Sequence, residues 1–251
     1  MTSLVVSPCS NPDMELEEVF AAYAALGYTQ FEMFTEWAKS HAEVEDAPAP
    51  YLELAKRYGF AYTSMHLPPI NEDLEGSLER AVRGARFARD LGAGVVLFKA
   101  TSRPLYLQAA GRFLDAIAGL GVTPVLQNHC GTPLSSLEDC AEVIAGLHDS
   151  RLRTLLEVGH FHKAGVPWAE AYPLLRGSLA LVHLKDMVGP RPVPFGTGEV
   201  DFPGLFAQLK ADGYSGNFVI EMEVPHQTRA QTLQLLGEAR EYIEALLDRD
   251  I

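Results

Sequence analysis

Eight short apolar runs, each followed by a stretch with helical periodicity, constrain the fold of this chain more than any other feature. The runs begin at Leu4, Tyr28, Ala61, Gly94, Thr123, Arg153, Leu179 and Asn217. Such alternation is typical of parallel strands joined by crossover helices. Eight units in 251 residues match the size of a closed barrel. We therefore expect an α/β fold, a single (β/α)8 TIM barrel domain covering residues 1–251.

Local signals support this interpretation. The turn after the first run reads SPCSNPD and has no glycine, whereas an open doubly wound sheet usually has a glycine-rich phosphate turn there. The first helix is expected to have Pro12 near its start and Gly27 just past its end. The fifth is expected to begin with Ser135 and Glu138 in capping-box spacing. The sixth unit is the weakest, because prolines leave room for only a short helix between Pro167 and Pro173.

Composition limits the partners and the compartment. Hydrophobic residues make up 47% and charged residues 21% of the chain, as in ordinary globular proteins. The formal charge of −13 repels nucleic acid and anionic membranes, so neither is expected as a partner. No apolar run approaches the roughly 18 residues of a membrane span. Three cysteines without a C-x-x-C pair favour a reducing, cytoplasmic setting.

Four consecutive strands end in a polar residue that interrupts an apolar run. These residues are Gln127, Glu157, His183 and Glu221. In barrels of this kind the active site lies at the C-terminal ends of the strands, where such side chains converge. Two carboxylates, an imidazole and an amide are costly to bury without a partner, and a divalent cation is the simplest compensation. The sequence therefore predicts one divalent metal ion, with Mn²⁺, Mg²⁺ or Co²⁺ favoured by the oxygens and Zn²⁺ kept open by the imidazole.

An alternative without a metal is a barrel mouth held by ion pairs. In that arrangement Glu157 and Glu221 would pair with Lys185 and Lys99, which also end strands. The sequence alone leaves both arrangements open.

The chain resembles the xylose isomerase-like family of sugar isomerases and epimerases along essentially its whole length. The segments that carry the resemblance are LQNH, LLEVGH, VHLKD, PFGTGEVDF and GYSGNFVIEMEV. The resemblance implies that Gln127, Glu157, His183 and Glu221 bind the metal. It also implies that His160, three residues after Glu157, lies near substrate oxygens.

Two residues depart from the family pattern. Glu157 stands where aspartate is usual, which lengthens that ligand by one methylene. Gln127 stands where the family has a glutamate that works with the glutamate of the eighth strand as a pair of proton-transfer groups. An amide accepts no proton at neutral pH, so Glu221 is left as the single base of the family type. Lys185 and His66 are the other candidates for a proton-transfer role.

Several further polar residues are candidates for contacts with substrate. His66 and Lys99 end the third and fourth strands, and Arg191 lies in the loop after the seventh. Glu32 and Trp37, on or just after the second strand, are expected to line the opposite wall. For His66 the alternative is a hydrogen-bonded residue of the pocket wall.

These residues favour a metal-dependent isomerase or epimerase that acts on a keto-sugar, polyol or related acid through an enediolate, with Glu221 as base. A lyase of the dehydroshikimate dehydratase type could use the same scaffold, and a non-catalytic sugar-binding barrel is a third alternative because of Gln127. Related DNA-repair endonucleases need more histidine and aspartate ligands than this chain offers. Assembly into a homo-oligomer is left open.

Overall fold

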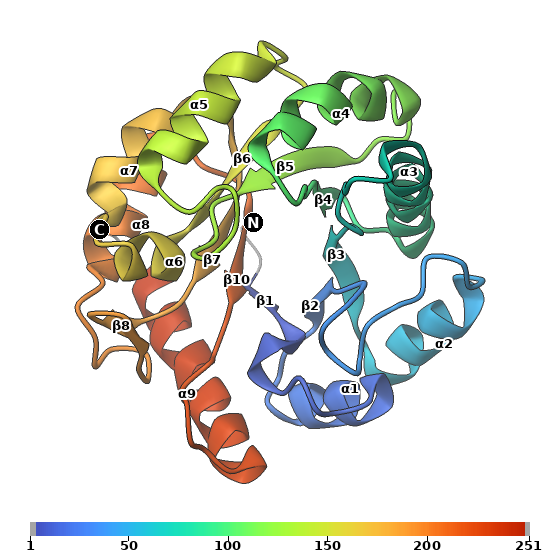
Figure 1. Ribbon diagram of the computed structural model, residues 1–251. Coiled ribbons are helices and arrows are strands. Elements are labelled where there is room, and N and C mark those ends of the chain that lie inside the picture. Colours follow the sequence, from blue (N-terminus) through green and yellow to red (C-terminus); the bar gives the residue numbers. More distant parts are fainter. Residues whose placement is uncertain (1–3, 249–251) are drawn as a thin grey trace.

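The computed structural model describes residues 4–248 and confirms the closed parallel barrel (Figure 1). Its strands follow one another around the barrel in the order β1-β10-β7-β6-β5-β4-β3-β2. The strands are β1 (Leu4–Val6), β2 (Gln30–Met33), β3 (Ala61–His66), β4 (Val95–Leu97), β5 (Thr123–Gln127), β6 (Arg153–Glu157), β7 (Leu179–Leu184) and β10 (Asn217–Ile220). A small antiparallel hairpin, β8 (Met187–Val188) with β9 (Arg191–Pro192), follows β7.

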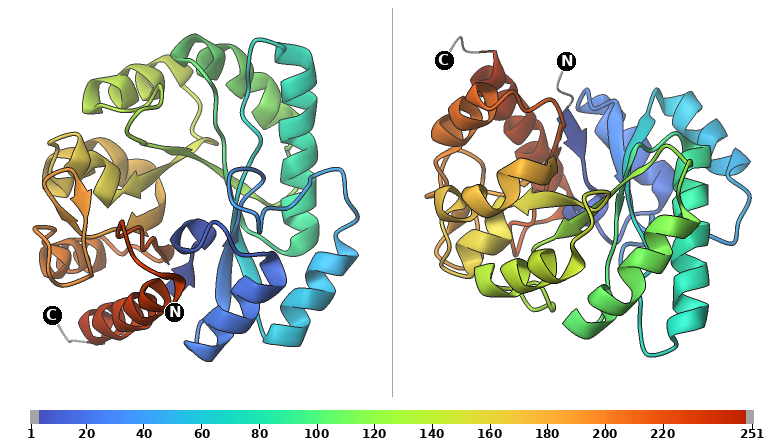
Figure 2. Two further views of the ribbon diagram at one scale, coloured as in Figure 1. Left: turned by 60° about the horizontal axis from the view of Figure 1, so that its bottom comes forward. Right: turned by 90° about the horizontal axis from the view of Figure 1, so that it is seen from above.

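Helices surround the strands on the outside of the barrel (Figures 1 and 2). They are α1 (Leu16–Ala25), α2 (Ala49–Tyr58), α3 (Leu74–Leu91), α4 (Arg103–Ala116), α5 (Leu137–Leu147), α6 (Val158–Lys163), α7 (Trp168–Leu175), α8 (Phe202–Ala211) and α9 (Arg229–Leu247). The last helix closes the ring beside the first, because Arg240 of α9 donates a 3.0 Å hydrogen bond to the carbonyl of Leu26, directly after α1. Among the described residues, no helix combines the length and hydropathy of a membrane-spanning segment.

The helix boundaries correct parts of the sequence interpretation. Gly27 follows α1 with a φ of 84°, a left-handed conformation that glycine adopts without strain. The helix itself begins at Leu16, later than Pro12 suggested, because Glu15 and Glu18 form its capping box. The capping box of α5 is also displaced by one residue.

In α5 the capping box is formed by Ser136 and Asp139, and the prediction of Ser135 and Glu138 was wrong. In the sixth unit the expected short helix is α7, which begins after Pro167 and has Pro173 inside it. The periodicity of the sequence did not predict α6, which starts directly at the end of β6 with Glu157 as its N-cap.

The inside of the barrel is filled by one apolar layer below the polar strand ends. Six buried side chains, one from each of six strands, form it: Val5, Leu97, Val125, Leu155, Leu181 and Val219. Because side chains alternate along a strand, the residue two positions later points to the same side. For the last four of these residues that position is Gln127, Glu157, His183 and Glu221, as the sequence predicted.

Candidate metal centre and active site

Glu157, His183 and Glu221 come together at the C-terminal ends of β6, β7 and β10. Their possible ligand atoms all lie within 4.8 Å of one another, and all three side chains are buried. Nδ1 of His183 lies 3.2 Å from Oε2 of Glu157 and 3.1 Å from Oε1 of Glu221. The pairing of β6 with β7 sets Glu157 directly beside His183. The structure thus brings together three of the four residues that the sequence assigned to a metal.

The backbone of Glu157 is fixed by hydrogen bonds, but only one of its two carboxylate oxygens accepts a hydrogen bond. The side chain of Asn128 fixes its backbone through hydrogen bonds of 2.8 and 2.9 Å. Its Oε1 accepts a 3.1 Å hydrogen bond from the backbone of Gly159 at the start of α6. Its Oε2 is buried and accepts no hydrogen bond, although Nδ1 of His183 lies 3.2 Å away. A buried carboxylate oxygen that accepts no hydrogen bond is costly, and it is the kind of atom that a bound cation compensates.

The electrostatics of the cluster reflect this burial. Burial and then the charge of Glu221 raise the pKa of Glu157 to about 7. Burial opposes the charged form of His183, but Glu32 and Glu221 outweigh it and raise the pKa of His183 well above its usual value. Without a cation, the cluster therefore retains protons at neutral pH that a divalent ion could replace.

Lys185 forms the ion pairs that the alternative arrangement required, but only for one of the two ligands. Its ammonium lies 2.9 Å from Oε2 of Glu221 and also contacts Glu223. Burial would raise the pKa of Glu221, but the charges of Lys185 and His183 hold it well below its usual value. None of the described ion pairs joins Glu157 to a lysine.

The stem of Lys185 lies directly over Gly159. A Cβ added at that glycine would lie 2.6 Å from Cβ of Lys185, so no larger residue fits without moving the lysine. The glycine therefore lets the ammonium group reach Glu221.

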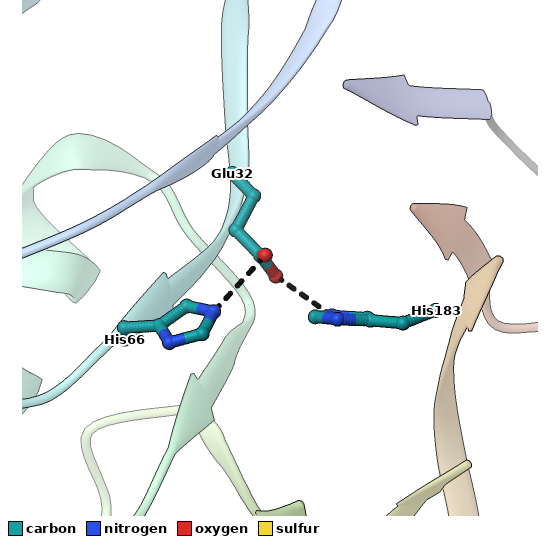
Figure 3. Close-up of side chains that lie close together, drawn as sticks. All are labelled: Glu32, His66 and His183. Carbon is teal, nitrogen blue, oxygen red and sulfur yellow. Dashed lines mark hydrogen bonds and ion pairs between the residues drawn. The ribbon is translucent and has the colours of Figure 1, made fainter. Parts of the chain in front are cut away.

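Glu32 lies closer to the cluster than the sequence indicated. It was expected to line a wall, but its buried carboxylate accepts hydrogen bonds from both His66 and His183, each of 3.1 Å (Figure 3). Ser64 donates a third, of 2.7 Å. Burial opposes its ionisation, yet the charges of His183 and His66 lower the pKa of Glu32 to about 2. The sequence signal was only an acidic residue within the otherwise apolar run FEMF, which places Glu32 on the strand but does not give its partners.

Gln127 ends β5, and its side chain is 7% exposed. It follows Val125 on the inward face of the strand. Among the described residues, no hydrogen bond joins its amide to Glu157, His183 or Glu221. Its role as a fourth ligand therefore stays a prediction.

The remaining candidates for substrate contacts occupy different surroundings. Nε2 of His66 is hydrogen-bonded to Glu32, and the centre of its ring lies 4.1 Å from the centre of the Phe34 ring. Lys99 forms a 2.9 Å ion pair with Glu36 at the mouth. Arg191 is exposed on β9, and none of its described contacts reaches the cluster.

His160 packs against His129, with ring centres 3.7 Å apart. Burial and the charge of Lys185 lower the pKa of His160 to about 2, and burial lowers that of His129 to about 4. Both rings are thus neutral and can offer hydrogen bonds without adding charge.

An open pocket of about 420 Å³ adjoins the cluster. Segments after β1, β2 and β10 line it, including Cys9, Trp37, Glu223 and His226. Cys9 and Glu223 offer atoms within 4.8 Å of Glu221, which connects the pocket to the cluster. Trp37 is 64% exposed, and both it and His226 have a left-handed backbone, with φ of 71° and 62°. Such conformations in non-glycine residues are uncommon and gather at functional sites.

The fold and cluster define a TIM barrel with a carboxylate and imidazole centre at its C-terminal mouth. The model of the family described as "Xylose isomerase-like TIM barrel" matches residues 20–246, and the chain belongs to this family. The resemblance inferred from the sequence is thereby confirmed.

Comparison with individual proteins adds relatives of this chain. It is 31% identical over 107 residues to the L-ribulose-5-phosphate 3-epimerase UlaE of Salmonella paratyphi C, a match that covers 35% of this chain and 37% of that enzyme. The match thus spans just over a third of the relative's length. The structure is similar to that of D-allulose 3-epimerase from Methylomonas sp., with a TM-score of 0.78, 16% identity and 98% coverage of both chains. It is also similar to the IolI protein with a bound zinc atom, with a TM-score of 0.76, 15% identity and 98% coverage of both chains.

Proposed function

We propose that this protein is a divalent-metal-dependent isomerase or epimerase of a keto-sugar, polyol or related acid, working through an enediolate. The observation that carries the proposal is the buried Oε2 of Glu157, which accepts no hydrogen bond and lies beside His183 and Glu221. Membership of the family and the epimerases among the similar proteins support the reaction class.

The donor set fits a divalent cation. Glu157, His183 and Glu221 would hold it, with Gln127 as a neutral fourth ligand. Carboxylates and one imidazole suit Mn²⁺, Mg²⁺ or Co²⁺ and are compatible with Zn²⁺, the metal found in the IolI structure. When bound, such an ion polarises a carbonyl oxygen and makes the neighbouring C–H more acidic.

Glu221 is the base in this proposal, and Lys185 controls its strength. With Lys185 on one oxygen and His183 on the other, Glu221 is ionised at neutral pH and ready to accept a proton. The same partners make it a weak base, so the C–H bond must be strongly activated before transfer. The ammonium of Lys185 also supplies positive charge where a substrate oxygen becomes negative.

The surrounding polar residues provide contacts for a hydroxyl-rich substrate. His160, together with His66 and Lys99, would bind its oxygens, with Arg191 reaching in from the hairpin. Trp37 offers an exposed aromatic face of the kind on which the apolar face of a sugar stacks. Gln127 supplies no second proton-transfer group, which favours a one-base reaction.

The direct test is a screen of ketoses in D₂O with protein of known metal content. We expect deuterium to enter the carbon next to the carbonyl in the loaded wild type and not in Glu221→Gln. Loss of water from the substrate, detected as a new alkene signal by NMR, would instead identify a dehydratase. Binding without any exchange or product would show a non-catalytic sugar-binding barrel and overturn the proposal.

A further inference from the structure

The carboxylate of Glu32 joins two histidines at the centre of the barrel. Its Oε1 accepts from Nε2 of His66, and its Oε2 accepts from Nε2 of His183 (Figure 3). The hydroxyl of Ser64 also donates to Oε2. The Glu32 side chain is fully buried, so these three donors replace the water it lost on folding.

The carboxylates of Glu32 and Glu157 therefore differ in how many of their oxygens accept hydrogen bonds. Both oxygens of Glu32 accept hydrogen bonds, while Oε2 of Glu157 accepts none and has only Nδ1 of His183 nearby, at 3.2 Å. Both carboxylates approach the same imidazole, but at different nitrogens: Glu32 lies at Nε2 and Glu157 at Nδ1. A cation placed against Glu157 would contact an oxygen that accepts no hydrogen bond, whereas one placed against Glu32 would have to displace existing hydrogen bonds.

This difference implies that the two nitrogens of His183 have different roles, one as hydrogen-bond donor and the other as metal ligand. An ionised carboxylate only accepts hydrogen bonds, so Nε2 of His183 must carry the proton that faces Glu32. Nδ1 then remains to face Oε2 of Glu157 at 3.2 Å and Oε1 of Glu221 at 3.1 Å. A metal ligand must offer a lone pair, and Nδ1 is the nitrogen whose proton can be exchanged for a metal.

We propose that Glu32 is a positioning residue that holds the His183 ring so that Nδ1, and not Nε2, binds the divalent ion. This inference rests on the proposed metal-dependent function. Carboxylates that orient a ligating histidine in this way raise its basicity, and their loss typically lowers metal affinity 10- to 100-fold. Ser64 and His66 act through Glu32, since both fix the direction of its carboxylate.

The competing arrangement is a metal held by Glu32, His66 and His183 themselves. Their possible ligand atoms also lie within 4.8 Å of one another. That site would use Nε2 of both histidines, remove their hydrogen bonds to Glu32 and leave Oε2 of Glu157 without a hydrogen bond. The two arrangements use different nitrogens of His183, so they can be separated by experiment.

The experiment is ¹⁵N NMR of histidine side chains in the protein before and after zinc is added, with zinc affinity measured by calorimetry. We expect the loaded wild type to show His183 coordinated through Nδ1 with a slowly exchanging proton on Nε2. Coordination through Nε2, or of His66 together with His183, would overturn the inference while leaving a metal site in place. Failure of zinc to bind the wild type at all would overturn the proposed function and this inference with it.

Glu32→Gln provides the second measurement. The amide places N–H groups against existing donors, so we expect a 10- to 100-fold loss of zinc affinity and a loss of the protected Nε2 proton. Glu45→Gln makes the same charge change on an exposed residue and should keep wild-type affinity. Equal affinity in Glu32→Gln and wild type would contradict the positioning role. If Glu32→Gln does not fold, the wild-type spectrum still decides which nitrogen binds.

Discussion

Lys185 places its ammonium group 2.9 Å from Oε2 of Glu221, where β7 and β10 end. The lysine also contacts Glu223, two residues further along the same segment. The two glutamates share one cation, but only Glu221 also lies 3.1 Å from Nδ1 of His183. In the proposed mechanism, this relationship separates the glutamate that acts as base from the one that only supports Lys185.

Replacing each glutamate by glutamine tests that separation. Glu221→Gln removes an anionic metal ligand and the base, so we expect turnover to fall by at least about 10²- to 10⁴-fold, the contribution of one acid–base group. Glu223→Gln should be much milder, because Lys185 keeps its pair with Glu221. Steady-state rates on an active substrate provide the measurement. Equal losses would show that the base is assigned to the wrong glutamate.

Gln127→Glu tests the departure from the family pattern. The new carboxylate adds a negative charge beside the metal and a second proton-transfer group across from Glu221. We expect tighter binding of divalent ions and a gain in hydrogen exchange and epimerisation at a ketose carbon. Deuterium incorporation and product stereochemistry on a panel of ketoses provide the readout. If the wild type already epimerises as fast, another residue supplies the second base and the one-base mechanism is wrong.

Metal binding should depend on pH because ligands must give up protons. Glu157, with a pKa of about 7, and His183, with a raised pKa, are both protonated in the metal-free protein at pH 6. The metal competes with these protons, so affinity should rise with pH, with about two protons released per ion at pH 6. Calorimetry in buffers of different ionisation enthalpy counts them. Glu157→Gln should release one fewer, and binding without proton release would contradict the cluster.

Gly159→Ala tests the contact beneath Lys185. The added Cβ would lie 2.6 Å from Cβ of Lys185 and force the lysine away from Glu221. We expect a loss of stability of about 1–3 kcal/mol, typical of overpacking, together with reduced turnover. Gly111→Ala is the matched control, since no atom lies within 4 Å of its added Cβ, and it should be neutral or slightly stabilising. Urea denaturation of both variants measures the difference.

The barrel and three of its polar strand ends could be predicted from the sequence because both follow from periodicity. Apolar runs mark the strands. Because side chains alternate along a strand, Glu157 points to the same side as Leu155, and His183 to the same side as Leu181. Helix boundaries were harder to predict, because neighbouring serines and acids allow two capping registers. In α5 the capping box is formed by Ser136 and Asp139, one residue later than Ser135 and Glu138.

The central position of Glu32 could not be derived in the same way. The pairing of β2 with β3 shifts register between Phe31 and Glu32, which sets Glu32 opposite Ser64. That irregularity brings Glu32 within hydrogen-bond distance of Ser64, and the closure of the barrel brings it to His183, 151 residues away in the chain. Neither the register shift nor the contact across the closed barrel can be seen in local sequence patterns.

The most direct test of the account is a crystal structure of the protein grown with Mn²⁺, with an anomalous map to locate the ion. We expect one anomalous peak within about 2.0 to 2.6 Å of a carboxylate oxygen of Glu157, Nδ1 of His183 and a carboxylate oxygen of Glu221. A map with no peak there, or with its peak between Glu32 and His66, would contradict it.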